Sequence, residues 1–299
     1  MKLLLVVNPI SGGIDKEAFL KNAITICEKY GINYHIFKTS GKADQQKLTD
    51  IINTFKPTKV ASVGGDGTTL FTCTALLHSN IPMGIIPLGS ANGMAEELFV
   101  NPKPEEALKD IIMSEVIGHL DMVQVNDNNF SIHIGDVGLN AQIVKGYDKD
   151  VNRGITTYAK YFIKELNSIK TFDIKIEANG ETINEPGIML GICNSRKYGT
   201  GVPLNANGNP MDGMFEIVLV KKMDVNILAK AGLSIFSDSF IDNENALVIS
   251  TTEAKITFNQ ERTLQLDGEI VGAFSTLDIK IIKGAVKFIT HSNNPYLKR

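Results

Sequence analysis

A cluster of glycines around a single acid is the feature of this 299-residue chain that most directly suggests chemistry. The segment Gly64-Gly65-Asp66-Gly67-Thr68 follows an apolar run at residues 59–63 and precedes a helix-like segment, so it is expected to form a turn between a strand and a helix. Glycines allow positive φ values and let another molecule approach the main-chain N–H groups closely. Because the positive end of the following helix lies behind it, such a turn binds an anion such as a phosphate.

The acid in this loop indicates a cation as well. An anionic ligand would repel the Asp66 carboxylate unless a metal ion lay between them, so we expect the loop to hold a nucleotide phosphate with Mg²⁺, or Asp66 to take up a proton. The structural alternative is a glycine-rich turn without a ligand, because short glycine motifs also occur by chance. The sequence has no G-x-x-x-x-G-K-[ST] motif, so phosphate is not held as in P-loop enzymes.

Two other polar loops follow short apolar runs in the same half of the chain. Asn8-Pro9-Ile10-Ser11-Gly12 ends the run at residues 3–7, and Leu88-Gly89-Ser90-Ala91-Asn92 follows the run at 84–87. In a parallel sheet the carboxyl ends of the strands meet at one edge, which is where α/β proteins bind ligands. We therefore expect the three polar loops to converge on one edge of a sheet.

The pattern around these loops predicts an α/β domain over residues 1–120. Apolar runs at 3–7, 34–37, 59–63 and 84–87 are typical of buried parallel strands. Helical periodicity separates them, over residues 19–30, 48–55 and 69–79. This alternation predicts a doubly wound parallel sheet.

Strands dominate after residue 120 and predict a β-rich second domain over residues 121–292. Alternating patterns and turn signals, including Asn179-Gly180, favour an antiparallel sandwich or barrel. Two helical inserts interrupt it, near residues 155–169 and 225–240. The second insert would line an acyl-chain groove, touch a bilayer or simply pack in the core. The predicted strands lie at 122–125, 130–134, 172–178, 215–219, 253–258, 263–266, 277–282 and 285–290.

Composition narrows the class of protein. The net charge of −3 and the lack of a long basic run argue against a nucleic acid partner. Cys27, Cys73 and Cys193 are odd in number and far apart, which indicates reduced packing residues in a cytoplasmic protein. The apolar N-terminal run stops at Asn8-Pro9, so it is too short for a signal peptide or a membrane span.

Four motifs in order resemble the diacylglycerol kinase catalytic family, to which sphingosine and ceramide kinases are related. They are Asn8-Pro9-x-Ser11-Gly12, Gly64-Gly65-Asp66-Gly67-Thr68, Pro87-Leu88-Gly89-Ser90-x-Asn92 and Asp267-Gly268-Glu269. The glycine motif alone also occurs in NAD kinases and phosphofructokinases. All four motifs in this order, spread through nearly the whole chain, are far more specific for the diacylglycerol kinase catalytic family.

The resemblance implies an α/β nucleotide domain, a β-rich lipid domain and an active site in the cleft between them, with a chain tail from about residue 293 that can return to the first domain. ATP would contact Asn8, Pro9, Ser11 and Gly12, Thr39, the loop at residues 64–68, Ser90 and Asn92. Asp66 would position Mg²⁺ through water, and Glu269 would be the general base. Asp212, with the main-chain carbonyls of Asn209 and Met214, would hold a second, structural Mg²⁺.

The expected activity is an ATP- and Mg²⁺-dependent kinase for a hydroxyl of diacylglycerol or a related lipid, with peripheral membrane contact and a possible homodimer. An NAD kinase-like enzyme and an inactive nucleotide- or lipid-binding regulator are the alternatives. The chain departs from the family pattern at Gly13, where a basic residue is common, at Thr69-Leu70-Phe71-Thr72 and at Gly93. Without the resemblance, Asp267-Gly268-Glu269 reads as an ordinary turn, and the segment around Asp212 as an ordinary loop.

Overall fold

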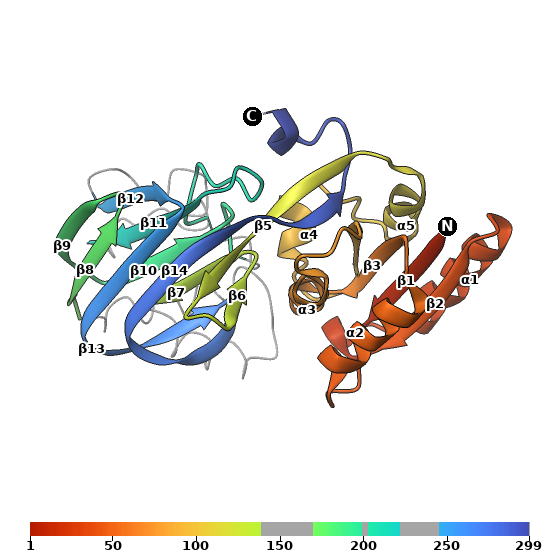
Figure 1. The fold of residues 1–299 in the computed structure, drawn as a ribbon, viewed down its shortest axis with the longest axis horizontal. Coiled ribbons are helices and arrows are strands. Elements are labelled where there is room, and N and C mark those ends of the chain that lie inside the picture. Colours follow the sequence, from red (N-terminus) through yellow and green to blue (C-terminus); the bar gives the residue numbers. More distant parts are fainter. Residues whose placement is uncertain (139–169, 199–202, 222–244, 299) are drawn as a thin grey trace, which may run out of the picture. The chain divides into compact units, whose positions relative to one another are not determined.

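The computed structural model describes residues 1–138, 170–198, 203–221 and 245–298, and it contains two compact units (Figure 1). The first unit comprises Met1–Leu120 with Lys283–Arg299, and the second comprises Asp121–Ile282. The helical inserts predicted near 155–169 and 225–240 lie outside the described residues. None of the helices in the described ranges is both long and apolar enough to cross a membrane.

The first unit is built on a parallel sheet. Its strands are β1 (Lys2–Val7), β2 (Asn33–Lys38), β3 (Lys59–Gly64) and β4 (Met83–Pro87), and their order is β4-β3-β1-β2. The helices α1 (Glu17–Lys29) and α5 (Pro104–Met113) pack together on the face that carries Leu3, Leu5 and Val7. The helices α2 (Asp44–Phe55) and α3 (Asp66–Leu76) contact each other outside that cluster. The predicted doubly wound α/β fold is therefore confirmed.

The helices of this unit differ from the sequence prediction in three ways. Helix α3 begins at Asp66 rather than at Thr69, because Gly65 is its N-cap residue and the acid joins the first turn. Helix α4 (Gly93–Glu97) was not predicted, since a helix of one turn is too short to show a periodicity. Helix α5 was also missed, although Pro104 at its start is a helix-initiating signal.

The second unit is antiparallel and encloses its own apolar core. Its strands follow the order β12-β11-β10-β7-β13-β14, with β8 joined to β13 and to β9, and β5 joined to β14 and to β6. The core draws inward-facing residues from most of these strands, among them Phe215, Ile217 and Ile256. The predicted β-rich domain is thus confirmed. The bounds are β5 (Ile117–Val125), β6 (Asn129–Ser131), β7 (Ile134–Val137), β8 (Phe172–Ala178), β9 (Glu181–Gly187), β10 (Met189–Cys193), β11 (Phe215–Val220), β12 (Ala246–Thr251), β13 (Glu253–Leu266) and β14 (Glu269–Ile289).

Several strand predictions need correction. The strand expected at 130–134 is interrupted, because the N–H groups of Ile132 and His133 donate to the Asp267 carboxylate instead of to a neighbouring strand. The two strands expected at 253–258 and 263–266 form the single strand β13, with a register shift between Thr257 and Arg262. Similarly, one long strand, β14, replaces the pair expected at 277–282 and 285–290.

The chain returns to the first unit at Lys283, inside β14, whereas the family resemblance implied a return from about residue 293. The reason is that β14 is continuous and its far end pairs in parallel with β4, where Phe288 lies beside Met83. The end of β14 thus forms an additional strand at the edge of the first unit's sheet, next to β4. A short 3₁₀ helix, Pro295–Lys298, follows it.

Candidate active site

The three polar loops of the first unit meet backbone to backbone. A Cβ atom placed on Gly12 would lie 2.7 Å from the carbonyl carbon of Gly89, and one placed on Gly89 would lie 2.3 Å from Cα of Gly65. Such distances leave no room for side chains, so the glycines allow the loops after β1, β3 and β4 to touch. The structure therefore brings together at one edge the loops that the sequence predicted to converge.

Hydroxyl groups line this meeting point. A Cβ atom on Gly64 would lie 2.3 Å from Thr68 Oγ1 and 3.1 Å from Ser11 Oγ, so both hydroxyls lie beside the same glycine. Ser11 Oγ is within hydrogen-bond distance of the carbonyl oxygens of Asn8 (3.2 Å) and Leu88 (3.4 Å). In contrast, Thr68 Oγ1 is buried and has no hydrogen-bond partner among the described residues. A buried hydroxyl without a partner is costly, so a ligand with polar atoms fits beside it.

The Asp66 carboxylate connects the glycine loop to helix α4. Its Oδ2 accepts a hydrogen bond from the Gly93 N–H at 3.0 Å, and its Oδ1 accepts one from the Met94 N–H at 2.8 Å. A carboxylate has two lone pairs on each oxygen, so both oxygens keep capacity for a further donor or a hydrated cation. An acid that the sequence linked only to a ligand thus also has a structural role.

Other predicted nucleotide contacts are partly engaged within their own loops. The amide of Asn92 closes its loop, since its Oδ1 accepts from the Gly89 N–H at 2.8 Å and its Nδ2 donates to the Gly89 carbonyl at 3.1 Å. Asn8 Oδ1 accepts from the Ile10 N–H at 3.2 Å. Thr39 follows β2, and its N–H donates to the Val7 carbonyl at 2.9 Å, which places it at the same edge of the sheet. Pro9, Gly67 and Ser90 are exposed.

Lys16 is a residue that the sequence analysis missed. Only 3% of it is exposed, and its Nζ donates to the main-chain carbonyls of Ser11 and of Ile14, the latter at 2.9 Å. Burial lowers the pKa of Lys16, and the nearby Asp15 partly opposes that shift. Within the described ranges no carboxylate lies at ion-pair distance from Lys16, so the ammonium group is buried beside the first polar loop with only the more distant Asp15 charge to offset it. Its signal in the sequence is an isolated lysine shortly after the loop, three residues beyond Gly13.

In the second unit, Asp267 and Gly268 form the two-residue turn between β13 and β14. Both have positive φ values, 49° and 91°, as a type I′ hairpin requires, and Leu266 pairs with Glu269 across the turn. The interpretation as a turn is therefore correct for the backbone. Because the Glu269 side chain is exposed at the start of β14, that geometry leaves it available for chemistry.

The Asp267 side chain anchors this turn. Its carboxylate accepts hydrogen bonds from Ser131 Oγ at 2.5 Å, the Ile132 N–H at 2.9 Å and the His133 N–H at 3.2 Å. Burial of the carboxylate raises the pKa of Asp267, although His133 and these hydrogen bonds act in the opposite direction.

The turn is also held from its other side. The Gly268 N–H donates to Gln265 Oε1, and Gln265 Nε2 donates to Asp136 Oδ2 at 2.7 Å. The turn that precedes Glu269 is therefore held by two separate sets of hydrogen bonds, one through Asp267 and one through Gln265.

Two acids hold the loop that was predicted to bind a structural metal, Asp212 of the loop itself and Asp121 of β5. Asp212 Oδ1 accepts from the Met214 N–H at 2.9 Å, while the Asn209 carbonyl is 3.4 Å from the Asp212 nitrogen. The buried Asp121 accepts from the Gly213 N–H at 2.6 Å. Burial raises the pKa of Glu216, and the negative charge of Asp212 raises it further. Carboxylate and carbonyl oxygens in close reach of one another are the donors that a hard cation prefers.

No group of three or more His, Cys, Asp or Glu side chains in the described part of the chain is arranged to hold a metal ion. The set predicted at Asp212 does not depend on such a group, since it consists of one carboxylate and two main-chain carbonyls.

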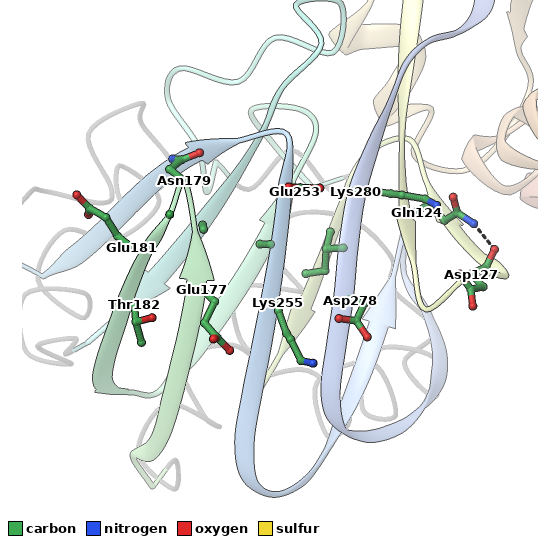
Figure 2. Close-up of a pocket in the computed structure, with 14 residues that line it drawn as sticks. Gln124, Asp127, Glu177, Asn179, Glu181, Thr182, Glu253, Lys255, Asp278 and Lys280 are labelled. Carbon is green, nitrogen blue, oxygen red and sulfur yellow. Dashed lines mark hydrogen bonds between the residues drawn. The ribbon is translucent and has the colours of Figure 1, made fainter.

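A polar groove of about 520 Å³ in the second unit is lined by none of the predicted site residues (Figure 2). It runs along the β8–β9 hairpin and strands β13 and β14. Cross-strand partners balance part of its charge, because Glu253 pairs with Lys280 and Lys255 pairs with Asp278. Such pairs are typical of a solvated sheet face, so the groove does not indicate a ligand site.

Comparison with known proteins agrees with this arrangement. The model of the diacylglycerol kinase catalytic domain matches residues 2–125, and that of the YegS C-terminal NAD kinase beta sandwich-like domain matches residues 136–290. The chain is 27% identical to the lipid kinase YegS of Escherichia coli (strain K12) over 286 residues, which cover 93% of each protein. It is 25% identical to a "Probable lipid kinase YegS-like" of Yersinia enterocolitica over 291 residues, which cover 95% of each.

The fold is also found among solved structures. The chain resembles a diacylglycerol kinase from Bacillus anthracis str. Sterne with a TM-score of 0.74 and 21% identity, over 98% of both chains. At that identity the likeness concerns the fold alone. The two domain models match in order along one chain, and they assign the family. The chain belongs to the diacylglycerol kinase catalytic family, with a C-terminal domain of the YegS type, and it is a lipid kinase.

Proposed function

We propose that this lipid kinase transfers the γ-phosphate of ATP, with Mg²⁺, to a hydroxyl of diacylglycerol or a related lipid. The observation that carries the proposal is the meeting of three glycine-containing loops beside the buried Thr68 hydroxyl, which has no hydrogen-bond partner in the described part of the chain. Phosphoryl transfer depends mainly on positioning and on neutralising charge, so a phosphate site built from main-chain N–H groups and hydroxyls suits it.

The donor nucleotide belongs to the first unit in this proposal. The loop at residues 64–68 and the start of α3 face the phosphates, with Ser11 and Gly12 on one side and Ser90 on the other. Asn8, Pro9, Thr39 and Asn92 shape the surrounding edge of the sheet. Lys16 adds the positive charge that position 13 lacks, and an anion above the loop would in turn offset the cost of burying that charge.

Asp66 fits a hydrated Mg²⁺ because both of its oxygens are oriented by α4 and each keeps a free lone pair. When bound, the ion would neutralise charge that develops on the transferred phosphate. Asp212, with the carbonyls of Asn209 and Met214, would hold the second ion. That ion would offset the negative charge of Asp212, which adds to the effect of burial in raising the pKa of Glu216.

The acceptor end of the reaction is assigned to Glu269. A lipid hydroxyl must lose a proton as it attacks, and an exposed carboxylate on an anchored turn can accept it. The transfer requires Glu269 to reach that hydroxyl while the first unit holds the donor phosphates. The lipid enters from a bilayer, so the proposal includes peripheral membrane contact during turnover.

The test is transfer of labelled phosphate from ATP to vesicles of extracted membrane lipid, with a panel of purified lipids and with NAD as the alternative acceptor. We expect labelled lipid, dependence on Mg²⁺ and no labelled NADP. Labelling of NAD alone would identify an NAD kinase-like enzyme. Binding of ATP without turnover on any lipid of the panel would identify a regulator that has lost activity. Either result would contradict the proposal.

A further inference from the structure

Helix α4 is held at both of its ends, and the two holding groups come from distant parts of the chain. At its start, the Gly93 and Met94 N–H groups donate to the Asp66 carboxylate at 3.0 and 2.8 Å. At its end, the Glu97 carboxylate accepts a hydrogen bond from the Tyr296 hydroxyl. Because a five-residue helix has almost no stability alone, its position depends on these contacts together with the packing of its buried Met94 and Ala95.

The residues after β14 form a second, polar attachment to the same helix end. We call residues 290–297 the C-terminal tail. Asn294 Nδ2 donates to the Leu98 carbonyl at 3.2 Å and to Thr290 Oγ1 at 2.8 Å, and its Oδ1 accepts from the Tyr296 N–H at 3.0 Å. Asn294 therefore both docks the tail on α4 and orients the backbone that carries Tyr296.

These contacts are buried. Tyr296 is 7% exposed and Glu97 is 3% exposed, and the Tyr296 ring packs edge-on against Phe99 with the ring centroids 5.8 Å apart. A hydrogen bond to a buried carboxylate is among the stronger ones in proteins, since loss of the donor leaves a charge poorly solvated. The tail is thus a firm support for α4 and not a loosely attached chain end.

From this continuous path of contacts we propose that the C-terminal tail is a positioning element for Asp66. The path runs from Tyr296 and Asn294 to the end of α4, along the helix, and from its first two N–H groups to the carboxylate of the glycine loop. The inference rests on the proposed function, in which Asp66 meets the hydrated Mg²⁺ of the nucleotide. Tyr296, Asn294 and Glu97 touch no substrate in it and act only through α4.

The test is Tyr296→Phe, which removes one hydroxyl and keeps the ring packed on Phe99. Calorimetric titration with ATP, with and without MgCl₂, is the readout. We expect the affinity for ATP with Mg²⁺ to fall about fivefold, equivalent to about 1 kcal/mol, while the affinity for ATP without Mg²⁺ and the KM for lipid stay unchanged. Glu97→Gln keeps an acceptor oxygen for the phenol and should retain most of the affinity.

The matched control is Tyr30→Phe, since Tyr30 is 54% exposed just after α1, and this variant should behave as the wild type. Hydrogen exchange of the peptide that covers residues 93–98 gives a readout independent of nucleotide. Tyr296→Phe should speed the exchange of the Gly93 and Met94 amides, and Tyr30→Phe should not.

The possible outcomes separate the two proposals. Wild-type protein that fails to bind ATP with Mg²⁺ would contradict the proposed function, but faster exchange at residues 93 and 94 in Tyr296→Phe would still support the tail as a support for α4. Unchanged exchange in a folded Tyr296→Phe protein would overturn the inference. Equal losses of affinity with and without Mg²⁺ would also overturn it, because the effect would then not pass through Asp66.

Discussion

Replacement of Asp66 can separate two roles of one carboxylate, which binds helix α4 and is also proposed to bind the metal. Asp66→Ala removes the acceptor for the Gly93 and Met94 N–H groups. The loss resembles removal of an N-cap residue, which costs roughly 0.5–2 kcal/mol, and the charge on the acceptor places it at the upper end. We therefore expect a decrease of about 2 kcal/mol in the free energy of unfolding, or roughly 4–8 °C in melting temperature.

Asp66→Asn provides the necessary contrast. An amide keeps one oxygen acceptor but turns an NH₂ group toward the second N–H, so roughly half of the stability loss should remain. It lacks the charge that a hydrated cation needs, and loss of an electrostatic contact to a transferring phosphate typically costs about 10²- to 10³-fold in rate. The Asn variant should therefore be nearly as inactive as the Ala variant while being clearly more stable.

The assay combines urea unfolding with turnover on vesicles at saturating Mg²⁺. Asp173→Ala is the control for loss of an exposed carboxylate, and it should change stability by no more than about 0.5 kcal/mol. If Asp66→Asn kept wild-type turnover, Asp66 would be a cap of α4 and nothing more. Wild-type stability in Asp66→Ala would refute the structural role assigned here.

Four further predictions follow from the other groups. Glu269→Gln should reduce turnover by about 10²- to 10⁴-fold with near-normal ATP affinity, since Gln keeps the size of the side chain but accepts no proton; near wild-type turnover on the phosphorylated lipid would exclude it as the base. Lys16→Met keeps the stem of the side chain without its charge and should weaken ATP binding about tenfold in calorimetry, whereas the exposed Lys21→Met should not. Asp212→Ala should lower both melting temperature and activity, and a chelator should lower the melting temperature of the wild type but not of the variant, because an ion bound only to the folded state stabilises it. For Asp267, burial raises the pKa in the folded state above the unfolded value near 3.8. At pH values between the unfolded and the folded pKa the folded state binds more protons, so the free energy of unfolding falls as pH rises through that range. Urea unfolding at a series of pH values should show a weaker dependence on pH for Asp267→Asn than for the wild type.

The sequence by itself determined the class of fold and the place where the loops meet. Apolar runs such as residues 3–7 and 59–63 specify buried parallel strands, and the carboxyl ends of such strands must share an edge. The turns at Asn179-Gly180 and Asp267-Gly268 were equally readable, because few residues tolerate the positive φ values that a two-residue hairpin needs. Local sequence patterns were therefore sufficient to predict where strands, loops and turns lie along the chain.

Only the tertiary structure decided what each polar side chain touches. Asp66 binds the N–H groups of a helix that begins 27 residues later, and Asp267 binds Ser131 across 136 residues. Nearly every residue has the same main-chain N–H donor and C=O acceptor. No sequence pattern therefore shows which of them a polar side chain will bind. The same holds for Lys16 beneath its loop and for the tail that supports α4. These contacts exist because packing brings distant segments together, and the orientation of the proposed site depends on them.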